Sequence, residues 1–181
     1  MTDRSGNMAD TVLGEVEVNK NQIDVDVALQ GMTAGTDANP IVLDLEIAFT
    51  DENFNVLEER VVSGIFGDAT LDQFTLTQVP EGTANLSVKA EKHLRKRIGA
   101  NVDENGQGIA EFVGDNQLLA GDLSGSNSVG TQDYFLLSEH WMGNVAESPE
   151  AAVADLSGNG VVGTAEYFLL QQNWMAVGDS K

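Results

Sequence analysis

The sequence DLSGSNSVGTQDYFLL occupies residues 122–137, and a near copy, DLSGNGVVGTAEYFLL, occupies residues 155–170. When both copies are extended to the Trp-Met pairs at residues 141–142 and 174–175, thirteen residues are identical at a constant offset of 33. Unrelated segments of this length would share only about one or two residues, so the chain contains an internal duplication that indicates a repeated structural unit.

Each copy spaces oxygen-bearing residues as a twelve-residue calcium loop does. Calcium takes six to eight hard oxygen ligands, supplied from loop positions 1, 3, 5, 7, 9 and 12. The ligands predicted in the first copy are Asp122, Ser124, Ser126, the Ser128 carbonyl and Asp133. Those predicted in the second copy are Asp155, Ser157, Asn159, the Val161 carbonyl and Glu166. We therefore expect two Ca²⁺ sites as the cofactors of this chain.

The turn and the helix that such a loop needs are also encoded. Position 6 requires a positive φ, and it is Gly160 in one copy and Asn127 in the other. Position 8 is valine in both copies, and we expect these valines to pack beneath the loops and couple them. Thr131 and Thr164 are predicted to cap a helix after each loop. Aromatic and leucine residues then recur at i, i+3 and i+7, which predicts an apolar stripe packed between two helices: Tyr134, Leu137, Trp141, Tyr167, Leu170 and Trp174.

The first part of the chain has the two-residue period of strands. Ile23, Val25, Val27 and Leu29 alternate with polar or small residues, and so do the apolar residues of 43–49. Further short runs at 12–18, 54–62, 74–79, 84–90 and 109–113 are separated by turn sequences such as 37–40 and 80–82. This pattern predicts an antiparallel β-sandwich over residues 10–114.

Charge and composition limit the function. The chain carries 29 acidic and 9 basic residues, a net charge of −20, and no cysteine. Nucleic acid would be repelled, thiolate metal sites and disulfides are excluded, and no apolar run reaches the roughly 18 residues that a membrane span needs. Residues 1–10 carry no signal-peptide core, so export would require a leader removed from this chain.

A basic cluster at residues 89–97 holds five of the nine basic residues. It is either a solvated strand and loop, or a docking patch for an acidic partner, which includes the acidic C-terminal segment of this chain or of another copy. The histidines, His93 and His140, have no counterpart in a catalytic pattern, because Asn173 replaces His140 in the second copy. We expect no catalytic residues and no enzymatic activity.

Two stretches resemble known families. Residues 76–90, LTQVPEGTANLSVKA, look like the carboxypeptidase-regulatory-like, transthyretin-type β-sandwich family. The duplicated segment resembles the type I dockerin family of paired EF-hand-like repeats. Together these resemblances imply a multidomain chain, with an antiparallel sandwich followed by a small all-α dockerin-like double EF-hand module at residues 117–176.

The second resemblance also implies a location and a partner. It implies a secreted or cell-surface protein that docks onto a cohesin-like domain. Recognition positions would be Thr131, Gln132, Ser138, Glu139, Thr164, Ala165, Gln171 and Gln172. Each loop departs from the family pattern in having Ser at position 3 and Gly at position 9, so we expect weak calcium affinity, roughly 10⁻⁵ to 10⁻³ M.

Two other functions compete with docking. The chain could be a structural subunit of an extracellular filament or surface assembly, stabilised by calcium and built by contacts with further copies. The sandwich could instead bind carbohydrate, but it offers phenylalanines that suit a core and neither Trp nor Tyr before residue 134.

Overall fold

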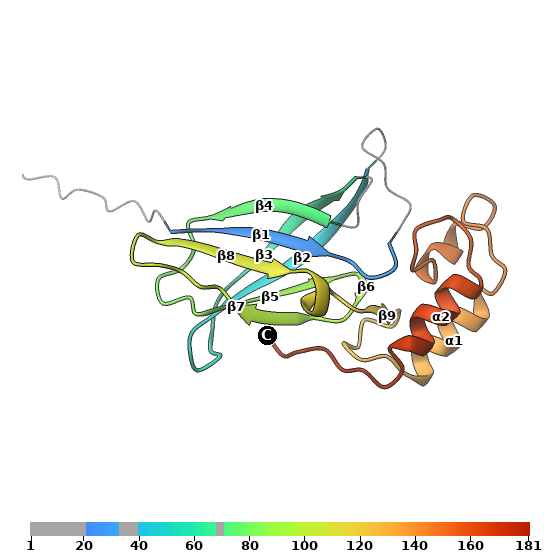
Figure 1. The fold of residues 1–181 in the computed structure, drawn as a ribbon. Coiled ribbons are helices and arrows are strands. Elements are labelled where there is room, and N and C mark those ends of the chain that lie inside the picture. The colour runs from blue at the N-terminus through green and yellow to red at the C-terminus, as the bar shows by residue number, and fades with distance from the viewer. Residues whose placement is uncertain (1–20, 33–39, 68–70) are drawn as a thin grey trace, which may run out of the picture.

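The computed structural model describes residues 21–32, 40–67 and 71–181 (Figure 1). The strand predicted at residues 12–18 and most of the turn predicted at 37–40 lie outside these residues. Strand β1 (Gln22–Ala28) confirms the two-residue period, because Ile23, Val25 and Val27 are buried while Asp24 is exposed. Each strand of this kind presents one apolar face to a core.

Two sheets face each other. The first has the order β4-β1-β8, in which β1 runs antiparallel to β4 (Leu71–Thr77) and parallel to β8 (Gln107–Phe112). The second has the order β3-β2-β5-β7 and is antiparallel throughout. Its strands are β2 (Ile41–Thr50), β3 (Val56–Phe66), β5 (Asn85–Ala90) and β7 (Lys96–Gly99).

The space between the sheets is a packed apolar core. Phe49, Phe66 and Phe112 are its largest fully buried side chains, which explains why these phenylalanines are not available as a sugar-binding platform. The core also takes Leu118, which follows the sandwich in the sequence and bridges to Leu29 at the end of β1. Burial of side chains of this size provides the main stabilisation of the sandwich.

The segment after β8 starts with a 3₁₀ turn, Gly114–Asn116, and strand β9 (Ala120–Asp122). Strand β9 pairs with β6 (Lys92–His93), a two-residue strand in the basic cluster. The helices α1 (Thr131–Glu139) and α2 (Thr164–Gln172) have nine residues each, and a second 3₁₀ turn, Pro149–Val153, lies between them. Figure 1 shows both helices at one end of the sandwich.

The predicted fold class is therefore wrong. The sandwich is not antiparallel, because β1 and β8 are parallel neighbours. The duplicated segment is not an all-α double EF-hand module, because strand β9 extends into its first residue, Asp122, and its two short α-helices are separated by a 3₁₀ turn. The described chain is a β-rich fold in which two short helices complete one end.

Polar contacts join that end to the sandwich. The Asn173 side chain donates to the Gln30 side chain at 2.5 Å and to the Ala120 carbonyl at 2.7 Å. Gly31, with φ +83°, lies so close to Leu169 that a Cβ at this position would be 2.4 Å from the leucine side chain. A side chain at this position would require Leu169 to move, and the positive φ favours glycine.

Candidate functional site

The first loop of the duplication (loop one, residues 122–133) holds two buried carboxylates. Asp122 and Asp133 are each 1% exposed. Asp133 accepts hydrogen bonds from the Ser124 amide at 2.9 Å and the Gly130 amide at 2.7 Å. One oxygen of Asp122 accepts from the Asn127 amide, whereas Asp122 Oδ1 and the Ser124 hydroxyl are buried without a hydrogen-bond partner. These two atoms belong to the predicted ligands at positions 1 and 3.

The second loop (loop two, residues 155–166) repeats this plan. Asp155 Oδ2 accepts from the Gly160 amide at 2.9 Å, and Glu166 accepts from the Gly163 amide at 2.8 Å and the Ser157 hydroxyl at 2.6 Å. Among the described residues, no Lys or Arg side chain forms an ion pair with Asp155 or Glu166. Two buried carboxylates without a counter-ion are unfavourable, and a bound cation would offset that cost.

The remaining predicted ligands are less enclosed. Ser126, Asn159 and Val161 are exposed, and Ser128 is half-buried. The Ser126 hydroxyl lies 2.8 Å from the Ser128 hydroxyl and 3.2 Å from its carbonyl oxygen, and the Asn159 side chain accepts from the Val161 amide. In each loop a hydrogen bond thus joins positions 3 and 12 and the position-1 carboxylate is buried, whereas position 5 lies at the surface.

The turn at position 6 is as predicted. Asn127 has φ +61° and Gly160 has φ +86°. Asn127 is tolerated there because its side chain is used: its Oδ1 accepts from the Arg95 amide at 2.8 Å, and its Nδ2 donates to the Asp179 carbonyl at 2.9 Å. The sandwich and the C-terminal tail therefore hold loop one at its sharpest bend.

Each loop is coupled to the chain that follows the helix of the other repeat. Val129 donates to the Ala176 carbonyl and accepts from the Met175 amide, while Val162 donates to the Gly143 carbonyl and accepts from the Met142 amide. In each case the valine of one repeat pairs with the end of the other repeat. Both valines are buried, as predicted, at 2% and 0% exposure. Each repeat therefore depends on the other for its strand pairing.

The helices begin one residue earlier than predicted. Gly130 and Gly163, not Thr131 and Thr164, are the N-cap residues. The Asp133 and Glu166 carboxylates reach back to the N-cap amides, so the third helical residue performs the capping. A carboxylate in the first turn also interacts favourably with the helix dipole.

The predicted apolar stripe is only partly buried. Leu137 and Leu170 are each 1% exposed and pack in a second core, together with Leu94, Val129 and Val162. The aromatic and methionine residues of both copies instead face outward, with exposures from 37% to 79%. This set, here called the aromatic face, consists of Tyr134, Phe135, Trp141, Met142, Tyr167, Phe168, Trp174 and Met175.

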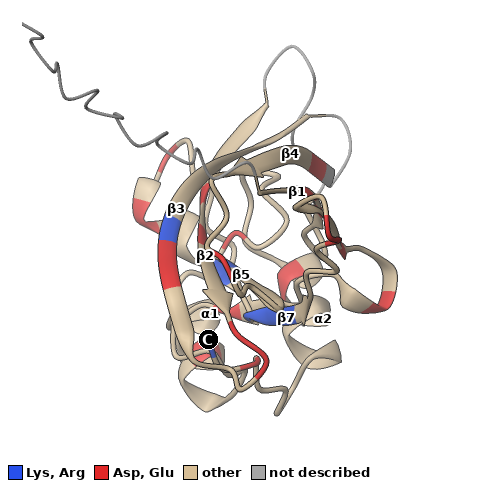
Figure 2. Cartoon of the chain, turned by 90° about the vertical axis from the view of Figure 1, so that its left-hand side faces the viewer, with Lys and Arg blue, Asp and Glu red and all other residues tan. Residues whose placement is uncertain are grey.

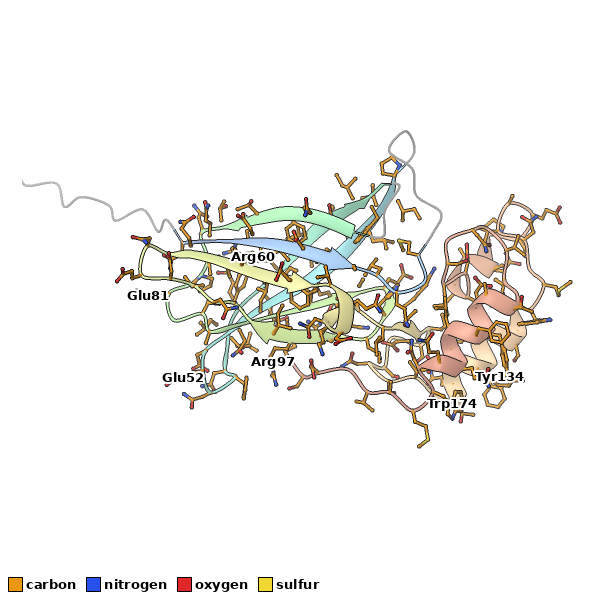
Figure 3. All side chains as sticks on the ribbon, in the orientation of Figure 1. Glu52, Arg60, Glu81, Arg97, Tyr134 and Trp174 are labelled. Carbon is orange, nitrogen blue, oxygen red and sulfur yellow. The ribbon has the colours of Figure 1, made fainter. Side chains whose placement is uncertain are left out.

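The aromatic face spans both repeats. The Trp141 and Tyr167 rings meet edge to face with centroids 6.5 Å apart, which joins the end of one copy to the start of the other helix. Figure 3 shows Tyr134 and Trp174 at the helical end, away from the sheets. The sequence contained a signal for this face: four consecutive apolar residues, Tyr-Phe-Leu-Leu, cannot all point to one side of a helix.

The eight predicted recognition residues are all exposed. Thr131, Gln132, Thr164 and Ala165 lie at the starts of the helices, and Ser138, Glu139, Gln171 and Gln172 lie at their ends. They are neighbours of the aromatic face along the chain. Their part in recognition stays a prediction.

The basic cluster contacts the duplicated segment of its own chain. Lys89 forms an ion pair of 2.6 Å with Asp122, and Lys92 donates to the carbonyls of Ala152 and Asp155. The Arg97 amide donates to the Asp179 carboxylate at 2.8 Å. Figure 2 shows the basic residues on β5 and β7, and Figure 1 shows the C-terminal tail returning along β7.

His93 lies in the basic cluster that contacts the duplicated segment, and its ring contacts backbone carbonyls. Its ring nitrogens lie 2.9 Å from the Glu91 carbonyl oxygen and 3.1 Å from that of Gln30. Burial lowers the pKa of His93, and the charges of Lys89 and Lys92 lower it further, against the opposing effect of the two carbonyls. The imidazole is therefore neutral near pH 7.

Within the described residues, no three His, Cys, Asp or Glu side chains gather as a metal-binding group. Each loop supplies two carboxylates, so hydroxyl, amide and carbonyl oxygens would have to complete a calcium shell. None of the described helices is long and apolar enough to cross a membrane.

The comparisons with known proteins bear on the fold. No protein-family model matches the chain, and no curated protein matches it. A chain from a crystal structure of a type II cohesin–X-dockerin complex of Acetivibrio cellulolyticus, a C-terminal interface mutant, matches with a TM-score of 0.63 and 14% identity. A chain from the N-terminal interface mutant of that complex matches with a TM-score of 0.62 and 12% identity. Each match covers 87% of this chain and 97% of the other.

The likeness is one of fold. It corrects the sequence-based recognition, because the similar structures come from type II complexes, and nothing in the comparisons supports a type I dockerin or a carboxypeptidase-regulatory-like sandwich. The short motifs that suggested those families, a Pro-Glu-Gly turn and a loop spacing, are too local to specify a whole fold.

Proposed function

We propose that this chain is a non-catalytic protein-docking module that binds a protein partner through its aromatic face. The observation that carries this proposal is the exposure of four matched pairs of aromatic and methionine residues on the two repeats. Contiguous exposed apolar surface on a protein marks an interaction site. Aromatic residues and methionine are the types that protein–protein interfaces favour.

The partner that we propose is a module of the kind that forms the other half of a cohesin–X-dockerin complex. Support comes from the fold, which is shared with chains of such two-protein complexes. The segment from residue 115 onward carries nine acidic residues and one basic residue, a net charge of −8. A partner surface with apolar pockets and a neutral or basic rim would complement it.

We propose further that calcium orders this face by binding both loops. The buried, unpartnered Asp122 Oδ1 and Ser124 hydroxyl support a cation in loop one, and the unpaired carboxylates of Asp155 and Glu166 support one in loop two. Bound calcium would neutralise these groups and couple metal binding to folding of the repeats. Weak sites of this type would fill in a medium with millimolar calcium, so we place the protein outside the cell or at its surface.

Docking can be tested by isothermal titration calorimetry. The chain would be titrated with cohesin and X-dockerin modules encoded by the same organism, in calcium. A Phe135→Asp/Phe168→Asp double variant should weaken the binding at least 100-fold, or by about 2.7 kcal/mol, because both side chains are 63% exposed in the native fold and would be central contacts.

A matched control is available on the sandwich. Val61 and Ile65 of β3 are 66% and 56% exposed, and a Val61→Asp/Ile65→Asp variant should bind as the native protein does. Equal weakening by both double variants would contradict docking through the aromatic face. A chain that binds no module but self-associates in calcium would replace the docking proposal with a structural-subunit role.

Calcium can be tested by thermal unfolding in calcium and in chelator. The native chain should melt at least several degrees higher in calcium, since a ligand that binds only the folded state stabilises it. An Asp122→Ala/Asp155→Ala variant should lose this shift. A Glu52→Ala/Glu81→Ala variant, which removes two exposed acidic groups far from the helices (Figure 3), should keep it. Identical melts of the native chain in both buffers would rule out the calcium role.

A further inference from the structure

The two loops differ in one contact that the duplication does not share. Lys89 lies on β5, and its ammonium group reaches Asp122 Oδ2 at 2.6 Å. The Asp122 side chain is 0% exposed and that of Lys89 is 13% exposed, so the pair is shielded from solvent. A shielded carboxylate that keeps its charge needs such a partner.

The residues around Lys89 favour its contact with Asp122. Glu46 is the cross-strand partner of Lys89 on β2, but its carboxylate pairs with Arg95 at 2.6 Å. The ammonium group of Lys89 also donates to the His93 carbonyl at 2.7 Å. Lys89 on β5 thus places a positive charge at loop one, held between the Asp122 carboxylate and the His93 carbonyl.

Loop two has no equivalent charge on its carboxylates. Lys92 is the described basic side chain that contacts loop two and the turn before it. It donates to the backbone carbonyls of Ala152 and Asp155 and not to the Asp155 carboxylate. Position 6 of loop two is Gly160, which has no side chain to bind the sandwich as Asn127 does. The carboxylates of loop two are therefore held only by hydrogen bonds within the loop.

We propose that Lys89 is a built-in counter-ion that keeps loop one closed without calcium, so that loop two is the calcium-responsive half of the duplication. This inference rests on the proposed calcium role of the loops. Calcium at loop one would be added to a loop that already contains one positive charge, and would therefore bind there less tightly than at loop two. Removal of calcium would open loop two first and disturb the α2 half of the aromatic face.

Two backbone amides report on the loops separately. The Asn127 amide donates to Asp122 and the Gly160 amide donates to Asp155, both at 2.9 Å, and each amide resonance should lie downfield while its loop is closed. The experiment is a calcium titration of the chelator-treated native chain followed by ¹H–¹⁵N NMR. Asn127 should keep its downfield position in chelator, whereas Gly160 should lose it and recover as calcium is added.

A charge-removing variant tests the residue itself. In Lys89→Met, both amides should lose their downfield positions in chelator and recover them as calcium is added. Lys89→Arg should behave as the native chain, and so should Lys96→Met, which removes a half-buried lysine of the same basic cluster.

Each failure has its own signature. If neither amide of the native chain responds to calcium, the proposed calcium role is wrong. If both respond together at the same calcium concentration, or if Lys89→Met leaves the Asn127 response unchanged, calcium binds but Lys89 is not the counter-ion. If Lys89→Met does not fold, the comparison of the Asn127 and Gly160 amides in the native chain still tests whether loop one stays closed without calcium.

Discussion

Single residues in this protein have roles that depend on distant partners. The position-6 turn of loop one could be predicted from sequence because positive φ is a local property. The reason for Asn127 in place of glycine could not, since its side chain binds Arg95 and Asp179, which lie 32 and 52 residues away. The same holds for Lys89 and Asp122, which are 33 residues apart.

His93 should make the stability of the fold depend on pH. Because burial lowers its pKa, the folded protein binds fewer protons than the unfolded chain around pH 6. Its contribution to the free energy of unfolding is therefore complete above the unfolded pKa of about 6.5 and is lost as the pH falls toward the folded pKa, with a slope of at most about 1.4 kcal/mol per pH unit.

This dependence can be measured by urea unfolding between about pH 7.5 and 5.5, which brackets the ordinary histidine pKa. The stability advantage of the native chain over His93→Gln should shrink as the pH falls. Gln171→Ala, which removes an exposed and non-titrating side chain of α2, serves as the control and should show a constant difference. An advantage that grows toward low pH would mean that His93 is stabilised in its charged form.

Elements were predictable where their period was clear. β1, β2, β4, β5 and β8 fall close to the predicted runs, because alternation of apolar and polar residues is a direct record of a half-buried strand. The bounds of β6, β7 and β9 were not predicted, because these strands are only two to four residues long and two of them begin in the basic cluster. The helices were predicted, but of their predicted apolar stripe only Leu137 and Leu170 are buried, because consecutive apolar residues leave the inner face ambiguous.

The inner and outer sides of α2 can be separated by two substitutions. Leu170→Ala should lower the free energy of unfolding by about 2–5 kcal/mol, because it creates a cavity in the core that Leu94 and Val162 share. Phe168→Ala should change that free energy by less than about 0.5 kcal/mol, since the ring is 63% exposed. Chemical denaturation of both variants would show the contrast, and a larger loss for Phe168→Ala would place the wrong side of α2 in the core.

At the scale of the whole molecule, the break in composition near residue 115 predicts a boundary between residues 10–114 and 117–176. The structure shows contacts that cross this point. Leu118 belongs to the core of the sandwich, and Leu94 of the basic cluster belongs to the core beneath the helices. Composition shows how charge is distributed along the chain, but it does not predict in which core a leucine is buried.

Truncation after residue 114 should therefore damage the sandwich. The loss of Leu118 opens its apolar core, and the loss of Asp122 leaves Lys89 without its partner. The fragment 1–114 should melt at a lower temperature than the full chain by circular dichroism, whereas a fragment 1–119, which keeps Leu118, should recover part of that loss. A fragment 1–114 that melts like the full chain would show that the sandwich folds independently of residues 115–181.

The crossed pairing of the two loops has a consequence for how such a protein could arise. A single repeat on its own would leave the backbone amide and carbonyl of its position-8 valine without these partners. A second, identical repeat related by a two-fold axis would supply them. The duplication therefore amounts to a symmetric dimer fused into one polypeptide. The covalent link keeps the halves at high effective concentration and also allows them to differ: one half has Asn127 and a bond from Lys89 as anchors to the sandwich, and the other has glycine at the turn.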